Sequence, residues 1–210
     1  MVNFVISFML LLFPAINNFE TFEGRIELVQ ETHYEKSYYT YFVKDNNVRI
    51  DKFDNEHQLL QSLIIKIKDE QVYVLCPSKK LYTKLITSET EEIKDDNFKI
   101  IKTENSRIIN GYNCYQWRVK NIERNTETAY WVSQNNFYFF EDLITLLNRT
   151  DKTFEFFEII PDTQGFFPML SVERTLLRKE KLRTYVVNIN NEKLDESKFI
   201  IPKNYKTIQD

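Results

Sequence analysis

The stretch Ser62–Lys68, SLIIKIK, decides the fold class because the character of its side chains alternates. Aliphatic residues stand at every second position from Leu63 to Ile67, while Lys66 and Lys68 point to the opposite face of an extended chain. This period of two is typical of a strand in an antiparallel sheet with one wet face. The stretch therefore predicts a sheet whose other face needs a cover.

Strand-like stretches lie on both sides of this one, separated by short turn signals. The aromatic and β-branched stretch Tyr38–Lys44, YYTYFVK, runs into the turn triplet Asp45-Asn46-Asn47. Further strands are expected at Gly24–Gln30, Val48–Phe53, Val72–Cys76, Lys80–Leu85, Phe98–Thr103, Arg107–Ile109, Asn113–Lys120, Thr126–Ser133, Leu170–Arg178 and Lys181–Asn190. The order predicts a long antiparallel meander.

One segment has a different spacing of its apolar residues. In Asn136–Thr150, the residues Phe137, Phe140, Ile144 and Leu147 are spaced by three and four, which predicts an amphipathic helix of about three turns. This helix is the obvious cover for the apolar face of the sheet. A curved sheet under such a cover either keeps an apolar cavity or has a filled core, and the pattern leaves both open.

Two segments follow the expected helix. Thr153–Ile160, TFEFFEII, is apolar and fits a second short helix or a strand. Pro161–Pro168 is rich in turn signals and is expected to be a loop. The fold class is therefore mainly β with some helix (α+β), and the helical material interrupts the meander once.

The N-terminus is apolar from Val2 to Ile16 apart from two polar residues and a proline, and its first charge is Glu20. A run of about 15 such residues is short for a membrane span and suits a signal peptide. We expect residues 1–18 to be the signal peptide, although the residues near Ala15 to Asn18 match a cleavage site poorly. Residues 19–210 are then expected to be a single domain. An uncleaved anchor or a core segment is the alternative. A cleaved signal peptide would make this an exported protein.

Composition excludes one class of function and supports the fold class. The chain of 210 residues has a formal net charge of -3, so it lacks the basic excess that nucleic acid binding requires. It contains 17 Phe and 12 Tyr against 3 Gly, and these aromatic residues favour half-buried strands.

The two cysteines, Cys76 and Cys114, raise the question of chemistry. Cys114 lies in YNCYQW without a nearby histidine or cation, so a buried structural thiol is favoured over a reactive one. An exported chain could also join the two cysteines in a disulfide. The sequence leaves that alternative open, because it does not show whether their strands come close enough.

Nothing else in the sequence makes a convincing active site. His33 and His57 are the only histidines, and neither stands in a metal-binding spacing. The acidic pairs Glu91-Glu92 and Asp95-Asp96 fall in a polar stretch expected to be a loop, where carboxylates stay solvated. No phosphate-binding or dinucleotide motif is present. We therefore expect no enzyme activity, no metal and no cofactor.

Two features suggest binding partners. Arg174, Arg178, Lys179, Lys181 and Arg183 surround several leucines near an expected hairpin tip, where they could meet anionic lipid headgroups, although a solvated hairpin is the simpler interpretation. Apolar residues also exceed what one helix stripe needs, which fits either a larger core or a lipid site. The residues expected to line such a site are Phe137, Phe140, Ile144, Leu147 and Phe166.

Short motifs resemble a known family. Ile109–Cys114 (INGYNC) is similar to an "I-x-G-Y-x-C" element, Thr128–Ser133 (TAYWVS) to "T-x-x-W-V-T", Gly165–Leu170 (GFFPML) to a longer form of "G-x-P-L", and Phe199–Tyr205 (FIIPKNY) to "F-x-I-P-x-x-Y". In this order they resemble the secreted bacterial domain of unknown function numbered 4412. That family is similar in turn to the outer-membrane lipoprotein carriers of the LolA and LolB type.

The resemblance implies a strongly curved antiparallel sheet, an incomplete β-barrel, with helices over its concave face. Because the carriers hold lipoprotein acyl chains, it also implies a periplasmic or secreted protein that binds a lipid or an acyl chain without catalysis. The expected location is the periplasm or cell envelope of a Gram-negative bacterium. The alternative is a structural or protein-interaction module of the cell envelope with a filled core. The oligomeric state and the protein partner stay open.

Overall fold

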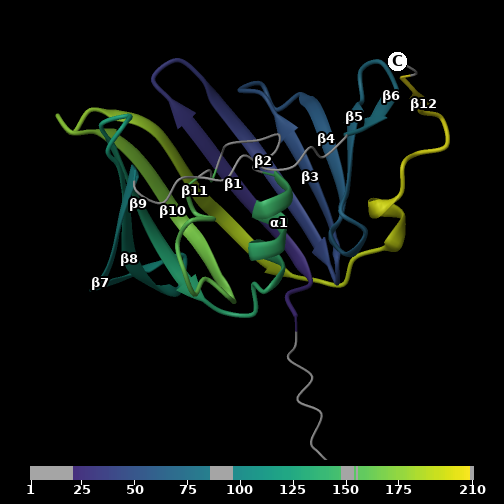
Figure 1. The fold of residues 1–210 in the computed structure, drawn as a ribbon. Helices are drawn as coiled ribbons and strands as arrows, with labels where there is room; N and C mark the ends of the chain where they lie inside the picture. Colours follow the sequence, from purple (N-terminus) through teal and green to yellow (C-terminus); the bar gives the residue numbers. More distant parts are fainter. Residues whose placement is uncertain (1–20, 86–96, 148–153, 155, 209–210) are drawn as a thin grey trace, which may run out of the picture.

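The computed structural model describes residues 21–85, 97–147, 154 and 156–208 (Figure 1). Most of the described chain forms one sheet, in the order β12-β6-β5-β4-β3-β2-β1-β11-β10-β9-β8-β7. The strands are β1 (Gly24–Thr32), β2 (Lys36–Lys44), β3 (Asn47–Phe53), β4 (Leu59–Lys66), β5 (Gln71–Cys76), β6 (Leu81–Lys84), β7 (Phe98–Ile109), β8 (Tyr112–Asn121), β9 (Thr126–Gln134), β10 (Phe166–Thr175), β11 (Glu180–Asn191) and β12 (Lys206–Thr207). The expected signal peptide, residues 1–18, lies outside the described residues.

The sheet is antiparallel except at one edge. Its middle is the pairing of β1 with β11, which runs from Gly24 opposite Asn191 to Thr32 opposite Leu182. At one edge the short β12 lies parallel to β6. The opposite edge is β7, and within the described residues β7 and β12 do not pair, so the sheet is not closed. The prediction of an open, curved antiparallel sheet is confirmed.

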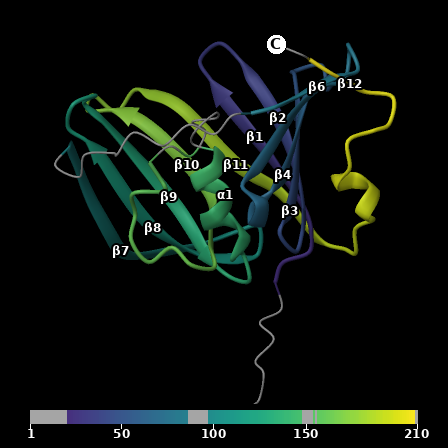
Figure 2. The same ribbon diagram turned by 45° about the vertical axis from the view of Figure 1, so that its right-hand side comes forward.

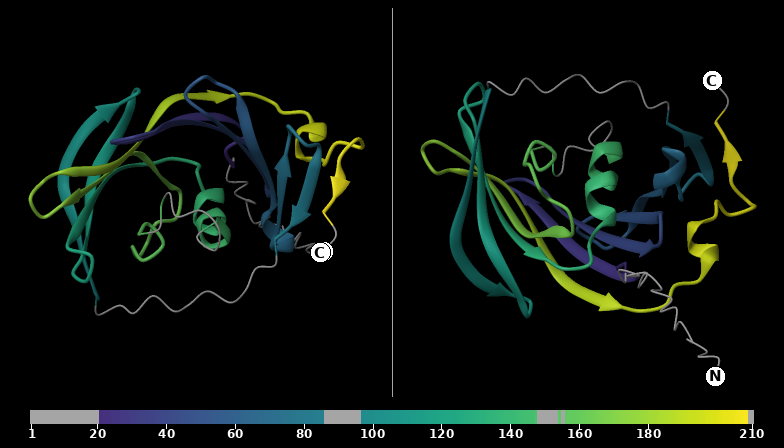
Figure 3. Two further views of the ribbon diagram at one scale, coloured as in Figure 1. Left: turned by 90° about the horizontal axis from the view of Figure 1, so that it is seen from above. Right: turned by 60° about the horizontal axis from the view of Figure 1, so that its bottom comes forward.

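The sheet curves around a single helix. Seen from above, the strands wrap around α1 (Phe139–Leu147) and the turn segment after it, and both lie on the concave side (Figures 2 and 3). The acidic residues Glu141 and Asp142 stand in the first turn of α1, where the partial positive charge of the helix terminus stabilises them. The prediction of a helix on the concave face is confirmed, although the described residues contain one α-helix rather than several.

The segment after α1 differs from its prediction. Thr153–Ile160 was expected to be a helix or a strand, but its described residues form consecutive turns. The amide of Phe157 donates to the carbonyl of Phe154 over 2.8 Å, and the amide of Ile160 donates to the carbonyl of Phe157 over 3.1 Å. These three side chains are buried, because the turns direct them into the core instead of along a strand.

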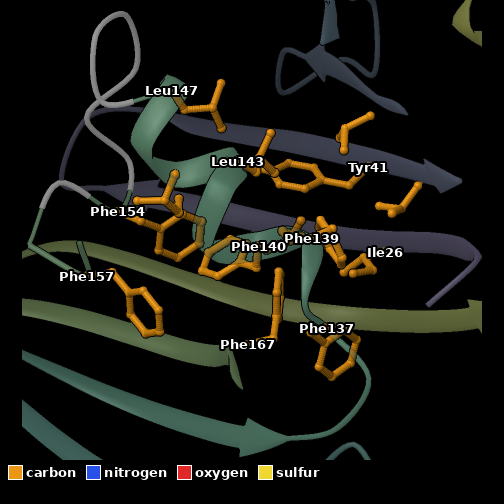
Figure 4. Packing of buried hydrophobic residues seen from close by; sticks show 14 of the residues in the cluster. Ile26, Tyr41, Phe137, Phe139, Phe140, Leu143, Leu147, Phe154, Phe157 and Phe167 are labelled. Atoms are coloured by element: carbon orange, nitrogen blue, oxygen red, sulfur yellow. The ribbon is translucent and has the colours of Figure 1, made fainter. Parts of the chain in front are cut away.

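A large apolar core fills the space between the concave face and this inner layer. Figure 4 shows side chains from α1 and from the turn segment pointing toward strand residues such as Ile26, Tyr41 and Phe167. The alternation predicted from the sequence explains the strand contribution, since every second residue of β2 is buried. The core therefore belongs to the concave side.

The convex face carries a separate, smaller apolar area. A short 3₁₀ helix, η3 (Glu196–Phe199), lies outside the sheet next to β3 (Figure 1). The Arg49 guanidinium donates to the carbonyl of Lys198 over 3.3 Å, and the Lys198 ammonium lies 4.5 Å from the ring centre of Phe42. Phe199 is buried although it is not part of the concave core. The C-terminal segment thus covers part of the face that the sequence predicted to be wet.

Three strand boundaries differ from prediction for local reasons. β7 was expected as two strands but runs through an irregularity between Lys102 and Ser106, which the hydrogen bond from the Thr103 hydroxyl to the Gln116 carbonyl (2.9 Å) bridges. β4 ends at Lys66, since the next three residues form the 3₁₀ turn η1 (Ile67–Asp69). β10 begins at Phe166, inside the expected loop.

Candidate functional site

The five residues predicted to line a site mostly meet in the concave core. Phe137 precedes α1, Phe140 and Ile144 lie on α1, and Leu147 is its last described residue. All four are buried members of one cluster. Phe166, the first residue of β10, is half-buried and packs against that cluster, with its ring centre 4.7 Å from that of Trp117. The spacing of three and four therefore identified residues that share one environment.

Aromatic rings fill the centre of this environment (Figure 4). The ring centre of Phe140 lies 4.5 Å from that of Phe167, 5.3 Å from that of Phe157 and 5.5 Å from that of Phe154, with each pair close to edge-to-face. Such arrangements are favourable beyond simple burial. In this conformation, the part of the concavity beneath Phe140 is packed.

An opening remains beside α1. A pocket of about 390 Å³ lies between the helix and the turn η1, with Ile67 and Leu146 on its apolar side. Both residues belong to the buried core, so the floor of the pocket is the edge of that core. The rim is polar, with Lys68, Glu70 and Asp142. The sequence analysis did not single out this pocket, although Ile67 belongs to the alternating stretch that predicted the sheet.

A second pocket lies beside the residues that precede α1. It measures about 430 Å³ and is more polar, with Asn135, Asn136 and Asn191 beside Phe22 and Phe137. The ring centres of Phe22 and Phe137 are 5.3 Å apart. Phe137 therefore lies between the core and this pocket. Ile144, in the middle of α1, does not line the pocket.

Both cysteines are free in the structure. Cys114 is buried on β8 with its thiol 3.4 Å from the carbonyl of Tyr112, and burial raises the pKa of the Cys114 thiol. Cys76 ends β5, and the hydrogen bond with the Ser78 hydroxyl lowers the pKa of the Cys76 thiol. The strands from β4 to β9 in the sheet order separate the two, so no disulfide joins them in this conformation.

Groups that could hold a metal do not gather in the described part of the chain, where no three of the residues His, Cys, Asp and Glu form a cluster. His33 and His57 are exposed, and the ring centre of His57 lies 4.1 Å from that of Tyr38, with the ring planes tilted by 32°. The acidic pairs Glu91-Glu92 and Asp95-Asp96 lie outside the described residues. Over the described ranges, we also find no helix with the length and hydrophobicity of a membrane span.

Comparison with known families decides the relationship. The model of the DUF4412 family, described as a domain of unknown function, matches residues 22–205. The chain belongs to the DUF4412 family. The sequence motifs predicted this membership, and the match confirms it. The family description assigns no activity, and no curated protein matches the DUF4412 chain in sequence.

Solved structures share its fold at low identity. An uncharacterised conserved protein from Thermus thermophilus is 8% identical, with a TM-score of 0.53 over 89% of this chain and 90% of that one. A chain of the Pseudomonas aeruginosa MucA/MucB complex is 9% identical, with a TM-score of 0.50 over 86% of this chain and 56% of that one. The DUF4412 chain therefore spans just over half of the second structure.

A third similar structure is a putative outer membrane lipoprotein-sorting protein domain from Vibrio parahaemolyticus. It is 5% identical, with a TM-score of 0.31 over 84% of this chain and 87% of that one. The fold comparison rests on the first two structures.

Proposed function

We propose that this DUF4412 protein is an exported protein of the cell envelope that binds an apolar ligand, a lipid or a lipoprotein acyl chain, without catalysing a reaction. The ligand occupies the concave side of the sheet, where α1 acts as a movable cover. The pocket beside α1 carries the proposal, because it opens on the apolar core at Ile67 and Leu146. Its volume of about 390 Å³ lies within the range of small-molecule sites.

The attachment of α1 supports its role as a cover. Within the described residues, no main-chain hydrogen bond links α1 to a strand, and side chains such as Phe140 and Leu143 hold it against the sheet. An acyl chain that slides between α1 and β4 would exchange one set of apolar contacts for another. Each buried methylene group contributes roughly 0.8 kcal/mol, so half an acyl chain gives useful affinity.

The titles of the similar structures name no lipid ligand, so the support for export comes from the N-terminus of this chain. One similar structure is titled a putative outer membrane lipoprotein-sorting protein domain, and another is the MucA/MucB complex. The apolar residues 2–16 fit a signal peptide and thus an exported protein.

Native mass spectrometry tests the proposal on protein purified from the periplasm of a bacterial host. We expect a mass excess that organic extraction removes as lipid, or uptake of added fatty acid or lipopeptide. The variant Thr145→Trp places a large ring in the pocket from the half-buried position Thr145 and should block uptake while the core stays intact. Ile144→Asp should also abolish retention.

Val187→Asp is the matched control, because it introduces the same charge at an exposed position away from the concave core. Circular dichroism confirms that each variant keeps its sheet. Retention of lipid by a folded Ile144→Asp or Thr145→Trp protein would count against the site. A wild-type protein whose mass equals that of the polypeptide alone, and which takes up no added lipid, would refute ligand binding.

A second candidate function is a protein-interaction module with a filled core. The close ring contacts of Phe140 with Phe154, Phe157 and Phe167 favour it, because they leave no space beneath that residue. Such a protein should not raise the fluorescence of an apolar dye in its native state, whereas a carrier should. The dye experiment therefore separates the two candidates.

A further inference from the structure

The tips of two neighbouring hairpins place large aliphatic side chains in water. Leu176 and Leu177, in the turn between β10 and β11, expose 62% and 93% of their surface. Ile122, in the turn between β8 and β9, exposes 62%. Single exposed aliphatic residues are ordinary, but three on adjoining turns are not explained by chance exposure alone.

The two turns are braced against each other. The amide of Leu176 donates to the carbonyl of Asn125 over 3.2 Å, which joins the β10–β11 turn to the β8–β9 turn. Within its own turn, the Thr175 amide donates to the Lys179 carbonyl over 2.9 Å, and the Thr175 hydroxyl accepts from the Lys179 amide over 3.2 Å. Figure 1 shows both tips at the same end of the sheet. The leucines are therefore held out by an ordered turn.

Cations without acidic partners stand beside the leucines. Arg178 and Lys179 are exposed and form no ion pair with any described residue. The nearest acids of the hairpin are already neutralised: Glu180 pairs with Arg183 at 2.7 Å and with Arg174 at 3.3 Å. A second acid, Glu173, accepts from the Lys181 ammonium over 2.9 Å.

We propose that Ile122, Leu176, Leu177, Arg178 and Lys179, which we call the leucine tip, dock the protein on a membrane surface that contains anionic lipid. The three aliphatic side chains enter the boundary between headgroups and acyl chains, and the two cations lie at the level of the lipid phosphates. Unpaired cations that flank exposed leucines match this layered chemistry, in which an apolar interior lies beneath a negative surface.

The charges of a turn farther along the same end of the sheet restrict the contact to one corner. The turn between β3 and β4 lies at the same end (Figure 1) and carries Asp54 and Glu56. An anionic membrane repels these carboxylates, so the end of the sheet cannot lie flat on it. Docking therefore tilts the protein onto the corner formed by the β8–β9 and β10–β11 turns, where three exposed cations outnumber one exposed carboxylate: Arg124, Arg178 and Lys179 against Glu123. This inference does not depend on the proposed ligand.

Vesicle co-sedimentation tests the proposal on the protein purified after export. Vesicles of phosphatidylcholine with about 30% phosphatidylglycerol are compared with vesicles of phosphatidylcholine alone, since that fraction is enough to give a strongly negative surface. We expect binding to the anionic vesicles that weakens as salt rises, because exposed charges are screened. All variants share one N-terminus, so differences between them report on the tip.

Matched pairs of variants separate the two contributions. The double variant Leu176→Ser with Leu177→Ser should lower the partition coefficient at least about tenfold, since burying one leucine is worth about that much. Its control, Ile108→Ser with Ile200→Ser, removes two exposed aliphatic side chains elsewhere and should leave binding unchanged. Arg178→Glu with Lys179→Glu should lower binding to the anionic vesicles more than about tenfold, as each cation contributes about fivefold.

The charge control is Lys84→Glu with Lys193→Glu, two exposed lysines that lie away from the leucine tip, at the end of β6 and after β11. It makes the same change in net charge and should reduce binding less than about threefold, given that distant exposed charges are screened. No binding of the wild-type protein to anionic vesicles would overturn the proposal. Equal losses of vesicle binding for the tip variants and their controls would overturn it too. Binding would then depend on the whole protein surface and not on the leucine tip.

Discussion

The two faces of the sheet use the same residue types for different purposes. On the concave face, Phe140 is buried among other aromatic rings. On the convex face, Phe42 is half-buried beneath the Lys198 ammonium at 4.5 Å. Ion pairs such as Arg49 with Asp51, 2.8 Å apart, also lie on that face. Burial on the concave face therefore contributes more to the free energy of unfolding, whereas side chains on the convex face stay partly in contact with water.

Truncation of one ring on each face gives the largest expected difference. Phe140→Ala should lower the free energy of unfolding by about 4 kcal/mol, because it leaves a cavity among three packed rings. Phe42→Ala should lower it by about 1 kcal/mol, since water already reaches that side chain. Urea denaturation measures both. Losses within about 0.5 kcal/mol of each other, the error of such differences, would remove the distinction between the faces.

The C-terminal segment provides the exception that sharpens the comparison. Phe199 is buried on the convex side, outside the concave core. Phe199→Ala should lower the free energy of unfolding by about 3 kcal/mol and release η3 from β3. Hydrogen exchange of the η3 amides should speed up as well. A loss below about 1 kcal/mol, the usual size for a surface change, would mean that η3 is a peripheral attachment.

The cysteines distinguish a buried position from an accessible one by reactivity. Cys76 should react with a maleimide near neutral pH on the order of 100-fold faster than Cys114, because only the thiolate attacks and Cys114 is buried. The Ser78 hydrogen bond, which lowers the pKa of Cys76, adds to the difference. Mass spectrometry of digested protein follows each site.

Denaturant provides the control for that experiment, since both thiols should then react at similar rates. A native mass lower by the two hydrogens of a disulfide, with no labelling at either site, would contradict the free thiols of the structure.

The smallest expected effect concerns an ion pair at the water-exposed hairpin. Hydrogen bonding from Arg183, with Arg174 nearby, holds the pKa of Glu180 below its usual value of 4.5. Glu180 therefore contributes stability that is fully present above pH 4.5 and is lost as the pH falls through its lower folded-state pKa.

The matching variant is Glu180→Gln. Its deficit relative to the wild-type protein should stay below about 1 kcal/mol at neutral pH, because the pair is exposed, and should vanish at low pH. Denaturation at a series of pH values measures this. A deficit that grows on acidification would reverse the sign of the argument.

The strands were largely predictable because burial acts on alternate residues, as the pattern of β2 shows. Local exceptions were not: β7 continues through Ser106 because a hydroxyl bridges its irregularity. The pairing of β12 with β6 joins distant residues and leaves no periodic signal in a strand of two residues. The sequence also did not anticipate that η3 covers part of the convex face.

The shared apolar environment of the predicted residues could be read from the sequence, but the shape of the space around them could not. The spacing of Phe137, Phe140, Ile144 and Leu147 showed a shared apolar stripe, and the structure places all four in one core. Whether rings fill the concavity or line it depends on how residues such as Phe167 and Phe154 interdigitate. That packing depends on segments far apart in the sequence, so a stripe on one helix does not determine it.

The pairing of β1 with β11 has a consequence for the order of events during synthesis. Gly24 meets Asn191 across the middle of the sheet, although nearly the whole described chain separates them. Contacts between such distant residues form late, and they slow folding. A nascent chain that still lacks β11 can assemble its early hairpins, but it has two half-sheets with open edges. The completed sheet must therefore wait until β11 has been synthesised, and aggregation through those edges is the competing outcome until then.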